Sequence, residues 1–278
     1  MDPKRLPPKR SLGQNFLVDP NIQRRIVEAA ELREGDEVVE VGPGRGALTR
    51  HLTELGLRLT LVELDDVLAR HWEERFSGDS SVTVVHGDIL ALPLSELSRD
   101  PTSLHVVGNI PYNITAPLLF HLLAPPRPQR ILVMVQREVA ERVVAPPGGK
   151  TYGALSVGVR SVAKVERVLE VPRGAFRPRP KVDSTVLRIT PRRPSPLDPS
   201  EEAELRRLVR AVFQWRRKQL RKILRDHPEL SLPPADVEAL LCEEGIPPTD
   251  RPESLSPEAF VRLSRSPVWN ASPQDPDR

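Results

Sequence analysis

The chain has 278 residues, of which 38% are hydrophobic and 28% charged, and this composition is typical of a globular protein with one large domain and a smaller one. Its formal net charge is only +3, and its single cysteine, Cys242, excludes an internal disulfide and a cysteine-rich metal site, so we expect no metal. The longest apolar run, residues 131–135, is too short to span a bilayer, and the N-terminus carries no secretory signal, which predicts a cytoplasmic protein without a membrane partner.

Strand-like apolar runs alternate with helical patterns through the first half of the chain. The predicted strands are residues 38–41, 59–62, 82–85, 104–107 and 131–135. Intervening segments such as 47–55 and 116–123 carry apolar residues at helical spacing. This alternation predicts an α/β fold with a mostly parallel sheet. Two later runs, 155–162 and 185–189, would add antiparallel strands at one edge.

The second half of the chain changes character after a stiff, proline-rich connector at residues 191–196. Residues 198–201 have the cap, proline and acid of a helix start, and a helical pattern follows to about Leu263. The pattern predicts four parts: a basic flexible arm (1–12), a large α/β domain (13–193), a small helical domain (198–265) and a disordered tail (266–278).

A glycine-rich loop, residues 40–46, closes the first predicted strand and opens a helix. Glycines at this place let a ligand approach the backbone closely. Gly42, Gly44 and Ala47 also satisfy the dinucleotide fingerprint G-x-G-x-x-A, and Glu63 lies 21 residues after Gly42. An NAD-dependent enzyme is therefore an alternative on the evidence of the loop alone.

Acids at the ends of the first three strands favour a different cofactor. Glu40 would repel a pyrophosphate and suits an ammonium group, Glu63 suits ribose hydroxyls, and Asp88 suits an adenine amino group. Any one of them could be a helix cap or a surface acid. Taken together, they predict a pocket for S-adenosylmethionine and hence a methyltransferase.

The segment Asn109-Ile110-Pro111-Tyr112 follows the fourth predicted strand. It offers a side-chain amide, a rigid backbone carbonyl and a flat aromatic surface, which together could hold the exocyclic amine of an extruded nucleobase. By itself the segment is equally compatible with a simple turn.

Basic residues concentrate in two stretches. Residues 206–225 contain nine Lys/Arg and no acid, and residues 173–193 contain seven Lys/Arg and one acid. A continuous helix through the first stretch would place a basic stripe opposite an apolar face, as a polyanion partner requires, although a solvated face is the alternative. Arg216 falls on the apolar side, and we expect it to reach past the core or to pair with an acid of the large domain. The predicted RNA-binding residues are Arg207, Arg210, Arg217, Lys218, Arg221 and Arg225.

These motifs resemble those of the KsgA-type rRNA adenine dimethyltransferases over nearly the whole chain. The matching segments are residues 13–17, 39–49, 62–65, 87–90, 109–115, 136–140, 152–156, 176–184 and 216–220. The resemblance implies a Rossmann-like methyltransferase sheet with a small C-terminal all-helical domain. The residues expected around S-adenosylmethionine are Asn15, Leu17, Glu40, Gly42, Gly44, Glu63, Asp88, Ile89 and Asn109.

The resemblance also implies an activity. The enzyme would dimethylate the N6 amines of two adjacent adenosines in the 3′-terminal hairpin of small-subunit (16S) rRNA, acting as a monomer on a pre-assembled subunit and releasing S-adenosylhomocysteine. The expected catalytic residues are Asn109, Pro111, Tyr112 and Phe176, which would accept the amine hydrogens and stack the base. Two alternatives remain: a macrolide-resistance methyltransferase of large-subunit rRNA, and a non-catalytic assembly factor. The small departures from the family pattern are Ile110, Arg177 and Arg179.

Overall fold

The computed structural model describes residue 9 and residues 13–270, without the side chains of 269 and 270. The chain divides into two compact units, one built from residues up to 140 with 164–191, the other from 141–163 with 192 onward. The single boundary predicted near residue 193 is therefore incomplete. Residues 141–163 also belong to the second unit, because the helix that they contain packs on later helices. Most of the predicted arm and residues 271–278 of the predicted tail lie outside the described residues.

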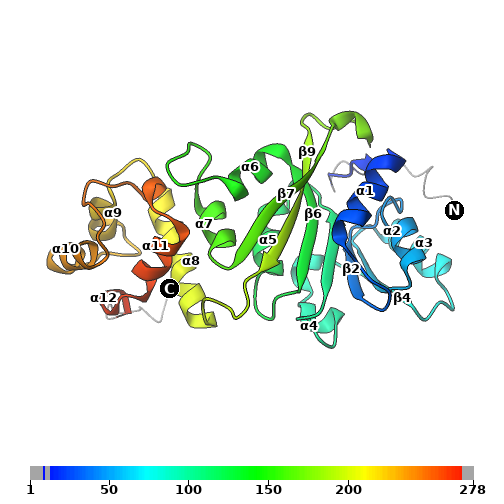
Figure 1. The fold of residues 1–278 in the computed structure, drawn as a ribbon, viewed down its shortest axis with the longest axis horizontal. Helices are drawn as coiled ribbons and strands as arrows, with labels where there is room; N and C mark the ends of the chain where they lie inside the picture. The colour runs from blue at the N-terminus through cyan, green and yellow to red at the C-terminus, as the bar shows by residue number, and fades with distance from the viewer. Residues whose placement is uncertain (1–8, 10–12, 271–278) are drawn as a thin grey trace. The chain divides into compact units, whose positions relative to one another are not determined.

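The first unit is built on a seven-stranded sheet of order β4-β3-β2-β5-β6-β9-β7 (Figure 1). Strands β4, β3, β2, β5 and β6 are parallel, and β9 runs antiparallel to β6. The α/β prediction is confirmed, as are all five early strands and the strand predicted at 185–189. The strands are β2 (Glu37–Val41), β3 (Arg58–Glu63), β4 (Val82–His86), β5 (His105–Asn109), β6 (Arg130–Gln136), β7 (Ala163–Val171) and β9 (Ser184–Pro191).

Helices lie between and beside the parallel strands, and the helical patterns at 47–55 and 116–123 are confirmed. These helices are α1 (Pro20–Ala30), α2 (Thr49–Leu52), η3 (Thr53–Leu55), α3 (Asp66–Arg75), η4 (Ile89–Ala91), α4 (Leu94–Leu97), α5 (Thr115–Leu122) and α6 (Arg137–Val144). Helix α1 starts on the capping side chain of Asp19 and buries Ile22, Ile26 and Val27 against the sheet residues Val38 and Leu132. This apolar core packs on one face of the sheet, beneath the loops that follow β2 and β5.

The strand predicted at residues 155–162 is wrong, because these residues form helix α7 (Ala154–Arg160) and the edge strand is the next segment, β7. At the start of the helix the backbone N–H of Gly153 donates to Oγ of Ser156 at 3.1 Å, and Ser156 is as fully buried as Val157 and Val159. An apolar run that is mostly buried fits a packed helix as well as a strand, so the run alone was ambiguous.

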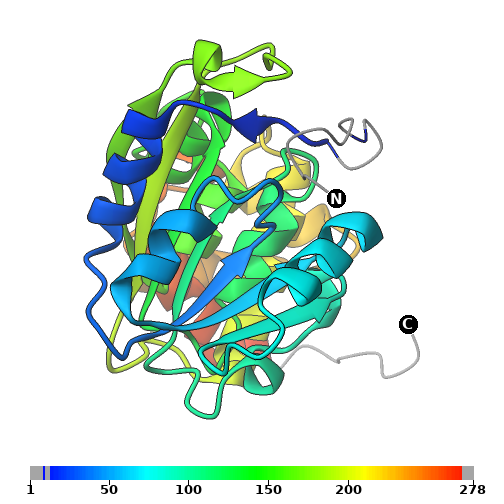
Figure 2. The same ribbon diagram turned by 90° about the vertical axis from the view of Figure 1, so that its right-hand side faces the viewer.

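A second, two-stranded sheet pairs β1 (Phe16–Leu17) with β8 (Phe176–Arg177) in antiparallel register. Figure 2 shows these segments side by side, although about 160 residues separate them in the sequence. The short helix η5 (Arg173–Ala175) precedes β8. This pairing was not predicted, and it carries the N-terminal segment to the edge of the main sheet.

The second unit is helical. It contains α7, α8 (Pro199–Gln214), α9 (Leu220–Asp226), α10 (Pro234–Glu243), η6 (Pro252–Ser254), α11 (Pro257–Arg265) and α12 (Pro267–Asn270). The predicted start is confirmed, since Asp198 caps α8 in a capping box with Glu201. Because residues 267–270 form α12, the predicted disorder from residue 266 is wrong for these four residues. No helix in the described part of the chain is long and apolar enough to cross a membrane.

The continuous basic helix predicted through residues 206–225 is wrong, because α8 ends at Gln214 and α9 begins at Leu220. The apolar face was nevertheless identified correctly: Leu205, Leu208, Leu220 and Ile223 are all at most 3% exposed. Burial therefore follows the predicted pattern, while the turn at 215–219 changes where the basic side chains point.

Candidate active site

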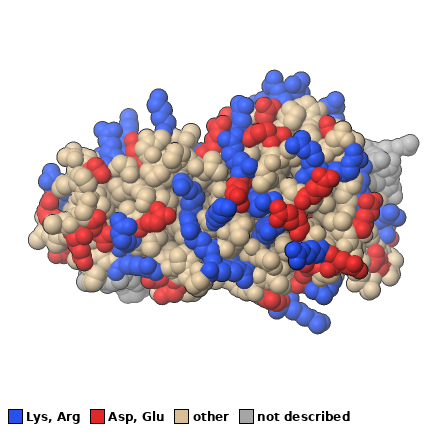
Figure 3. Space-filling model, viewed as in Figure 1, with Lys and Arg blue, Asp and Glu red and all other residues tan. Residues whose placement is uncertain are grey.

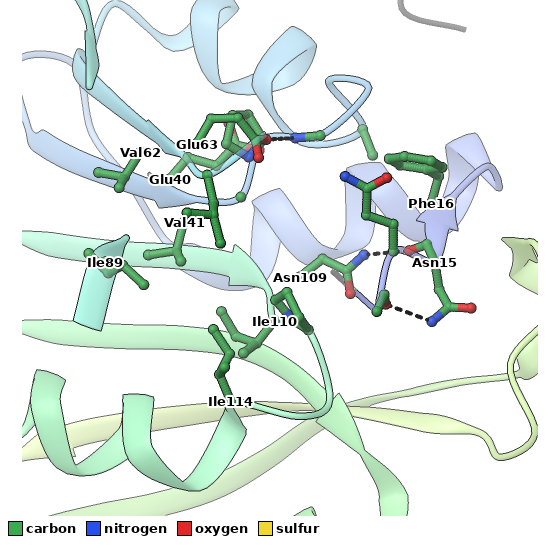
Figure 4. A pocket seen from close by; sticks show the side chains of 18 of the residues that line it. Asn15, Phe16, Glu40, Val41, Val62, Glu63, Ile89, Asn109, Ile110 and Ile114 are labelled. Carbon is green, nitrogen blue, oxygen red and sulfur yellow. Dashed lines mark hydrogen bonds between the residues drawn. The ribbon is translucent and has the colours of Figure 1, made fainter. Parts of the chain in front are cut away.

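A pocket in the first unit collects residues from the carboxyl ends of β2, β3, β4 and β5, where the strand order changes direction (Figure 4). Ligands of open α/β sheets bind at such a switch point. The pocket is open to solvent, and its empty space including that open mouth is about 960 Å³. Every predicted cofactor residue lines it: Asn15, Leu17, Glu40, Gly42, Gly44, Glu63, Asp88, Ile89 and Asn109.

The glycine loop forms one wall of the pocket. Gly42 has φ +66°, and a Cβ placed on it would meet no atom within 4 Å, so the pocket reaches its backbone directly. Gly46 has φ +79°, and a Cβ there would lie 2.5 Å from Cη2 of Trp72. The Trp72 indole N–H donates to the Gly44 carbonyl at 3.1 Å. Trp72 therefore holds the loop from behind, a role that the sequence pattern did not reveal.

Glu40 and Glu63 are both buried in the pocket wall, at 2% and 5% exposure. Burial raises the pKa of Glu40 to about 8, and its Oε2 atom has no hydrogen-bond partner in the described part of the chain. Glu63 accepts hydrogen bonds from the backbone N–H groups of Gly44 and Asp65, each at 2.9 Å, and burial raises its pKa. The Glu40 oxygen is a buried acceptor that a cationic or amine ligand would satisfy.

Asp88 and Ile89 lie at the end of β4. Asp88 is exposed and caps η4, because its Oδ1 accepts from the backbone N–H of Leu90 at 2.9 Å. The cap uses one carboxylate oxygen, so the other can accept from a ligand. Asp88 can therefore be both a helix cap and a ligand acceptor. Ile89 is buried at 4% exposure, while Leu64 on the β3 side is 50% exposed. These apolar side chains are suited to the faces of a flat ring.

Asn109 ends β5, and its side chain has a fixed orientation. Its amide nitrogen donates to the backbone carbonyl of Asn15 at 3.1 Å, and the Asn15 side chain donates to the Gly13 carbonyl at 3.1 Å (Figure 4). A carbonyl can only accept, so the contact identifies the Asn109 nitrogen and leaves its Oδ1 as an acceptor for a ligand.

Pro111 and Tyr112 continue from Asn109 along the pocket wall. The Pro111 carbonyl already accepts from the backbone N–H of Ile114 at 3.2 Å, and the Thr115 hydroxyl lies 3.5 Å from it and 3.4 Å from the Tyr112 carbonyl. A ligand N–H can take the second lone pair of Pro111 when the Thr115 hydroxyl donates to Tyr112. The Tyr112 hydroxyl lies 2.9 Å from Oγ of Ser184, which is completely buried on β9. Burial raises the pKa of Tyr112, so the hydroxyl stays protonated at neutral pH. Ser184 thereby holds the hydroxyl end of the ring in place.

Phe176 does not line the pocket, contrary to its predicted place against a substrate base. It is 0% exposed and packs in the core with Leu17, Ile22 and Val171. The reason is the β1–β8 pairing, which sets Phe176 opposite Leu17 and turns both side chains inward. In this structure Phe176 supports the strand that carries Phe16 and Leu17 to the pocket.

The predicted RNA-binding residues lie in the second unit, and acids that the stripe prediction did not include pair with four of them. Arg207 pairs with Glu204, Arg210 with Glu229, Arg221 with Glu238 and Arg225 with Asp226, at 2.9, 2.7, 3.5 and 2.6 Å. The remaining two, Arg217 and Lys218, are exposed in the turn between α8 and α9, and Lys218 Nζ lies 4.1 Å from the centroid of the Trp215 ring.

Arg216 pairs with Glu253 at 2.7 Å and donates to the Gly149 carbonyl. Both partners belong to the second unit, so the predicted pairing with an acid of the large domain is wrong. The sequence pattern placed Arg216 toward the apolar side correctly, but it could not identify an acid 37 residues away.

A further contact that sequence reasoning missed joins Lys9 to the start of α3. The Lys9 ammonium lies 2.8 Å from Asp65 and 2.9 Å from Asp66, and the Gln14 side chain donates to Asp65 at 3.0 Å. Gln14 and Asp65 lie in two of the motifs that carried the resemblance. The presence of both motifs was the only indication in the sequence, and it did not predict that the two side chains are in contact.

Comparison with known proteins identifies close relatives. The sequence model of a family described as ribosomal RNA adenine dimethylase matches residues 6–266. A protein named ribosomal RNA small subunit methyltransferase A from Nitratidesulfovibrio vulgaris is 44% identical over 272 residues, covering 96% of this chain and 99% of the relative. A protein of the same name from Pseudomonas aeruginosa is 42% identical over 257 residues, covering 92% and 93%.

Two solved structures resemble the fold over most of the chain. A dimethyladenosine transferase from Plasmodium falciparum superposes with a TM-score of 0.73 and 27% identity, covering 89% of this chain and 95% of that one. The 23S rRNA methyltransferase ErmE superposes with a TM-score of 0.68 and 29% identity, covering 92% and 100%.

Proposed function

Because the chain belongs to the ribosomal RNA adenine dimethylase family, we infer that it is an S-adenosylmethionine-dependent methyltransferase that dimethylates adenine in small-subunit rRNA. The observation that carries the chemistry is the fixed Asn109 amide, whose nitrogen is held by the Asn15 carbonyl so that Oδ1 remains an acceptor in the pocket. An acceptor in this position suits the exocyclic amine of adenine.

The pocket fits S-adenosylmethionine by the chemistry of its acids. The unsatisfied Oε2 of Glu40 can accept from the cofactor ammonium, and ionisation of Glu40 is favoured once that positive charge is near. Glu63 is oriented by two backbone donors and can accept from ribose hydroxyls with its remaining lone pairs. The second oxygen of Asp88 can accept from the adenine amino group. When bound, the cofactor supplies an electrophilic methyl group on a sulfonium.

The substrate adenine would be held by Asn109, Pro111 and Tyr112. Acceptance of the two N–H hydrogens by Asn109 Oδ1 and the Pro111 carbonyl draws the amine toward a pyramidal geometry, in which its lone pair can attack. The Tyr112 ring, fixed by Ser184, would stack on the base, and such stacking contributes about 1–3 kcal/mol per base. Positioning for in-line attack, rather than a strong general base, then accounts for the rate.

In the second methyl transfer, the same residues must hold an amine that already carries one methyl group. A monomethylated amine keeps one N–H, so it can donate to only one of the two acceptors, Asn109 Oδ1 or the Pro111 carbonyl. The mouth of the pocket is open, which allows spent cofactor to be exchanged between the two transfers.

The finer assignment of the substrate is also a proposal. We place the reaction on the two adjacent adenosines of the 3′-terminal hairpin of 16S rRNA, within a pre-assembled small subunit and with the enzyme acting as a cytoplasmic monomer. Support comes from the 44% identity over 272 residues to a relative named for the small subunit.

The direct test is incorporation of labelled methyl groups from S-adenosylmethionine into unmethylated small subunits, followed by mass spectrometry of the rRNA. We expect N6,N6-dimethyladenosine at two adjacent positions. Asn109→Ala should lose transfer by at least about 100-fold because it removes an acceptor that orients the amine, while RNA binding persists. Wild-type turnover by this variant, or methylation of large-subunit rRNA instead, would contradict the assignment.

A further inference from the structure

We propose that the segment from Arg173 to Lys181 binds phosphates of the RNA strand that flanks the target adenine. Its four cationic side chains, Arg173, Arg177, Arg179 and Lys181, are all exposed, and the segment contains no acid. We call these four residues the basic edge. The inference rests on the proposed function in one respect, namely that the polyanion is RNA.

The basic edge lies one strand away from the pocket. In the β1–β8 pairing, Arg177 is opposite Phe16 and Phe176 is opposite Leu17, and both Phe16 and Leu17 line the pocket. Paired strands lie about 4.8 Å apart. When a base is extruded into an enzyme pocket, the phosphates on either side of it stay outside. Arg177 lies on the strand paired with this part of the pocket wall, and the other three cations lie within four residues of it in the chain, so we place the flanking phosphates against them.

No carboxylate lies within ion-pair distance of the basic edge among the described residues. The nearby Asp183 accepts from the backbone N–H of Arg173 at 2.9 Å and pairs with Arg137 at 3.6 Å. The guanidinium of Arg177 donates to the carbonyls of Gly174 and Phe176, and that of Arg173 donates to the Lys181 carbonyl. These bonds orient the side chains without neutralising them, in contrast to the paired arginines of the second unit.

The backbone beneath the basic edge is held at several points. The N–H of Val18 donates to the Ala175 carbonyl at 2.8 Å, and Asp183 accepts from the N–H of Arg173. Lys and Arg side chains gather along the upper edge of Figure 3, where Figure 1 places the connection between β7 and β9. A held backbone reduces the entropy lost when the cations engage phosphate.

The test compares two charge-matched variants for binding to in vitro transcribed small-subunit rRNA over a range of salt concentrations. Arg179→Gln/Lys181→Gln removes two charges that make no hydrogen bond or ion pair in the described structure. The control, Lys164→Gln/Arg167→Gln, removes two exposed charges of β7 that pair with Glu166 and Glu170. Loss of two phosphate contacts should weaken binding roughly 25- to 60-fold at 0.1 M salt and lower the salt slope by about 1.4–1.8.

Support requires that only the edge variant loses RNA affinity and salt slope, with unchanged affinity for S-adenosylmethionine. Wild-type RNA affinity in the edge variant would overturn the proposal, as would an equal loss in the control, since that would reflect net charge alone. The single variant Arg177→Gln gives an independent check, with an expected 5- to 8-fold loss. Binding is read without turnover, so absence of methylation by the wild-type protein would contradict the proposed function and leave this result interpretable.

Discussion

At the scale of single residues, the pocket is organised by hydrogen bonds that leave one acceptor open on each functional side chain. Asn109 uses its nitrogen on Asn15 and keeps Oδ1, Asp88 uses one oxygen as a helix cap, and Glu63 uses two backbone donors for orientation. Such contacts hold the acceptors in place before a ligand arrives. Preorganisation of this kind reduces the cost of ordering them during catalysis.

The contact between Tyr112 and Ser184 predicts that the two residues act as a unit. Ser184→Ala and Tyr112→Phe should each lower kcat about 5-fold, with little change in cofactor affinity, because each removes a hydrogen bond worth about 1 kcal/mol. The double variant should be no worse than either single variant. Steady-state kinetics of the four proteins measures this, and additive losses would show that Ser184 acts only through packing.

The raised pKa of Glu40 predicts a pH dependence of stability. An unfolded glutamate ionises near pH 4.5, whereas the folded Glu40 remains protonated until about pH 8, so the folded state binds the extra proton between these values. The free energy of unfolding of the apoprotein should therefore fall as the pH rises from 4.5 to 8, by several kcal/mol at most. Denaturant titrations across this range should show a flatter profile for Glu40→Gln.

The matched control for this prediction is Glu31→Gln. Glu31 is exposed, and the charge of Arg188 lowers its pKa, so in the folded protein it is ionised above pH 4.5 and its contribution is confined to the acidic end of the range. Its substitution should leave the slope over the rest of this range unchanged. If Glu40→Gln kept the wild-type slope, the buried glutamate would already be ionised in the folded protein.

At the scale of elements, the loop after β2 depends on helix α3 behind it. Gly46→Ala would force a Cβ into the Trp72 ring, which in turn supports Gly44 through the indole N–H. We expect a loss of about 1–3 kcal/mol in stability and a weaker affinity for S-adenosylmethionine, measurable by denaturation and calorimetry. Gly78→Ala is the control, because Gly78 has φ +88° and no atom within 4 Å of its Cβ position. An equal loss of cofactor affinity in both variants would argue against the Trp72 contact.

At the scale of the whole molecule, we propose that both units contribute to binding. The first unit holds the pocket, and the second carries basic residues whose availability depends on neighbouring acids. Arg217→Gln/Lys218→Gln should weaken rRNA binding more than Arg210→Gln/Arg221→Gln, because Glu229 and Glu238 already pair with the latter two. Filter binding at several salt concentrations compares them. Equal losses would show that RNA displaces the acids.

The sequence by itself determined the α/β fold, the strand ends that carry the acids and the Asn109 segment, because parallel strands bring their carboxyl ends to one edge. Buried apolar positions in α8 and α9 were also predictable from periodicity. The tertiary structure alone decided the rest. The pairing of Phe176 with Leu17 points the Phe176 side chain toward the core, and a hydrogen bond connects Tyr112 to Ser184. These contacts link residues far apart in the chain, and no local pattern encodes which distant partner a side chain meets.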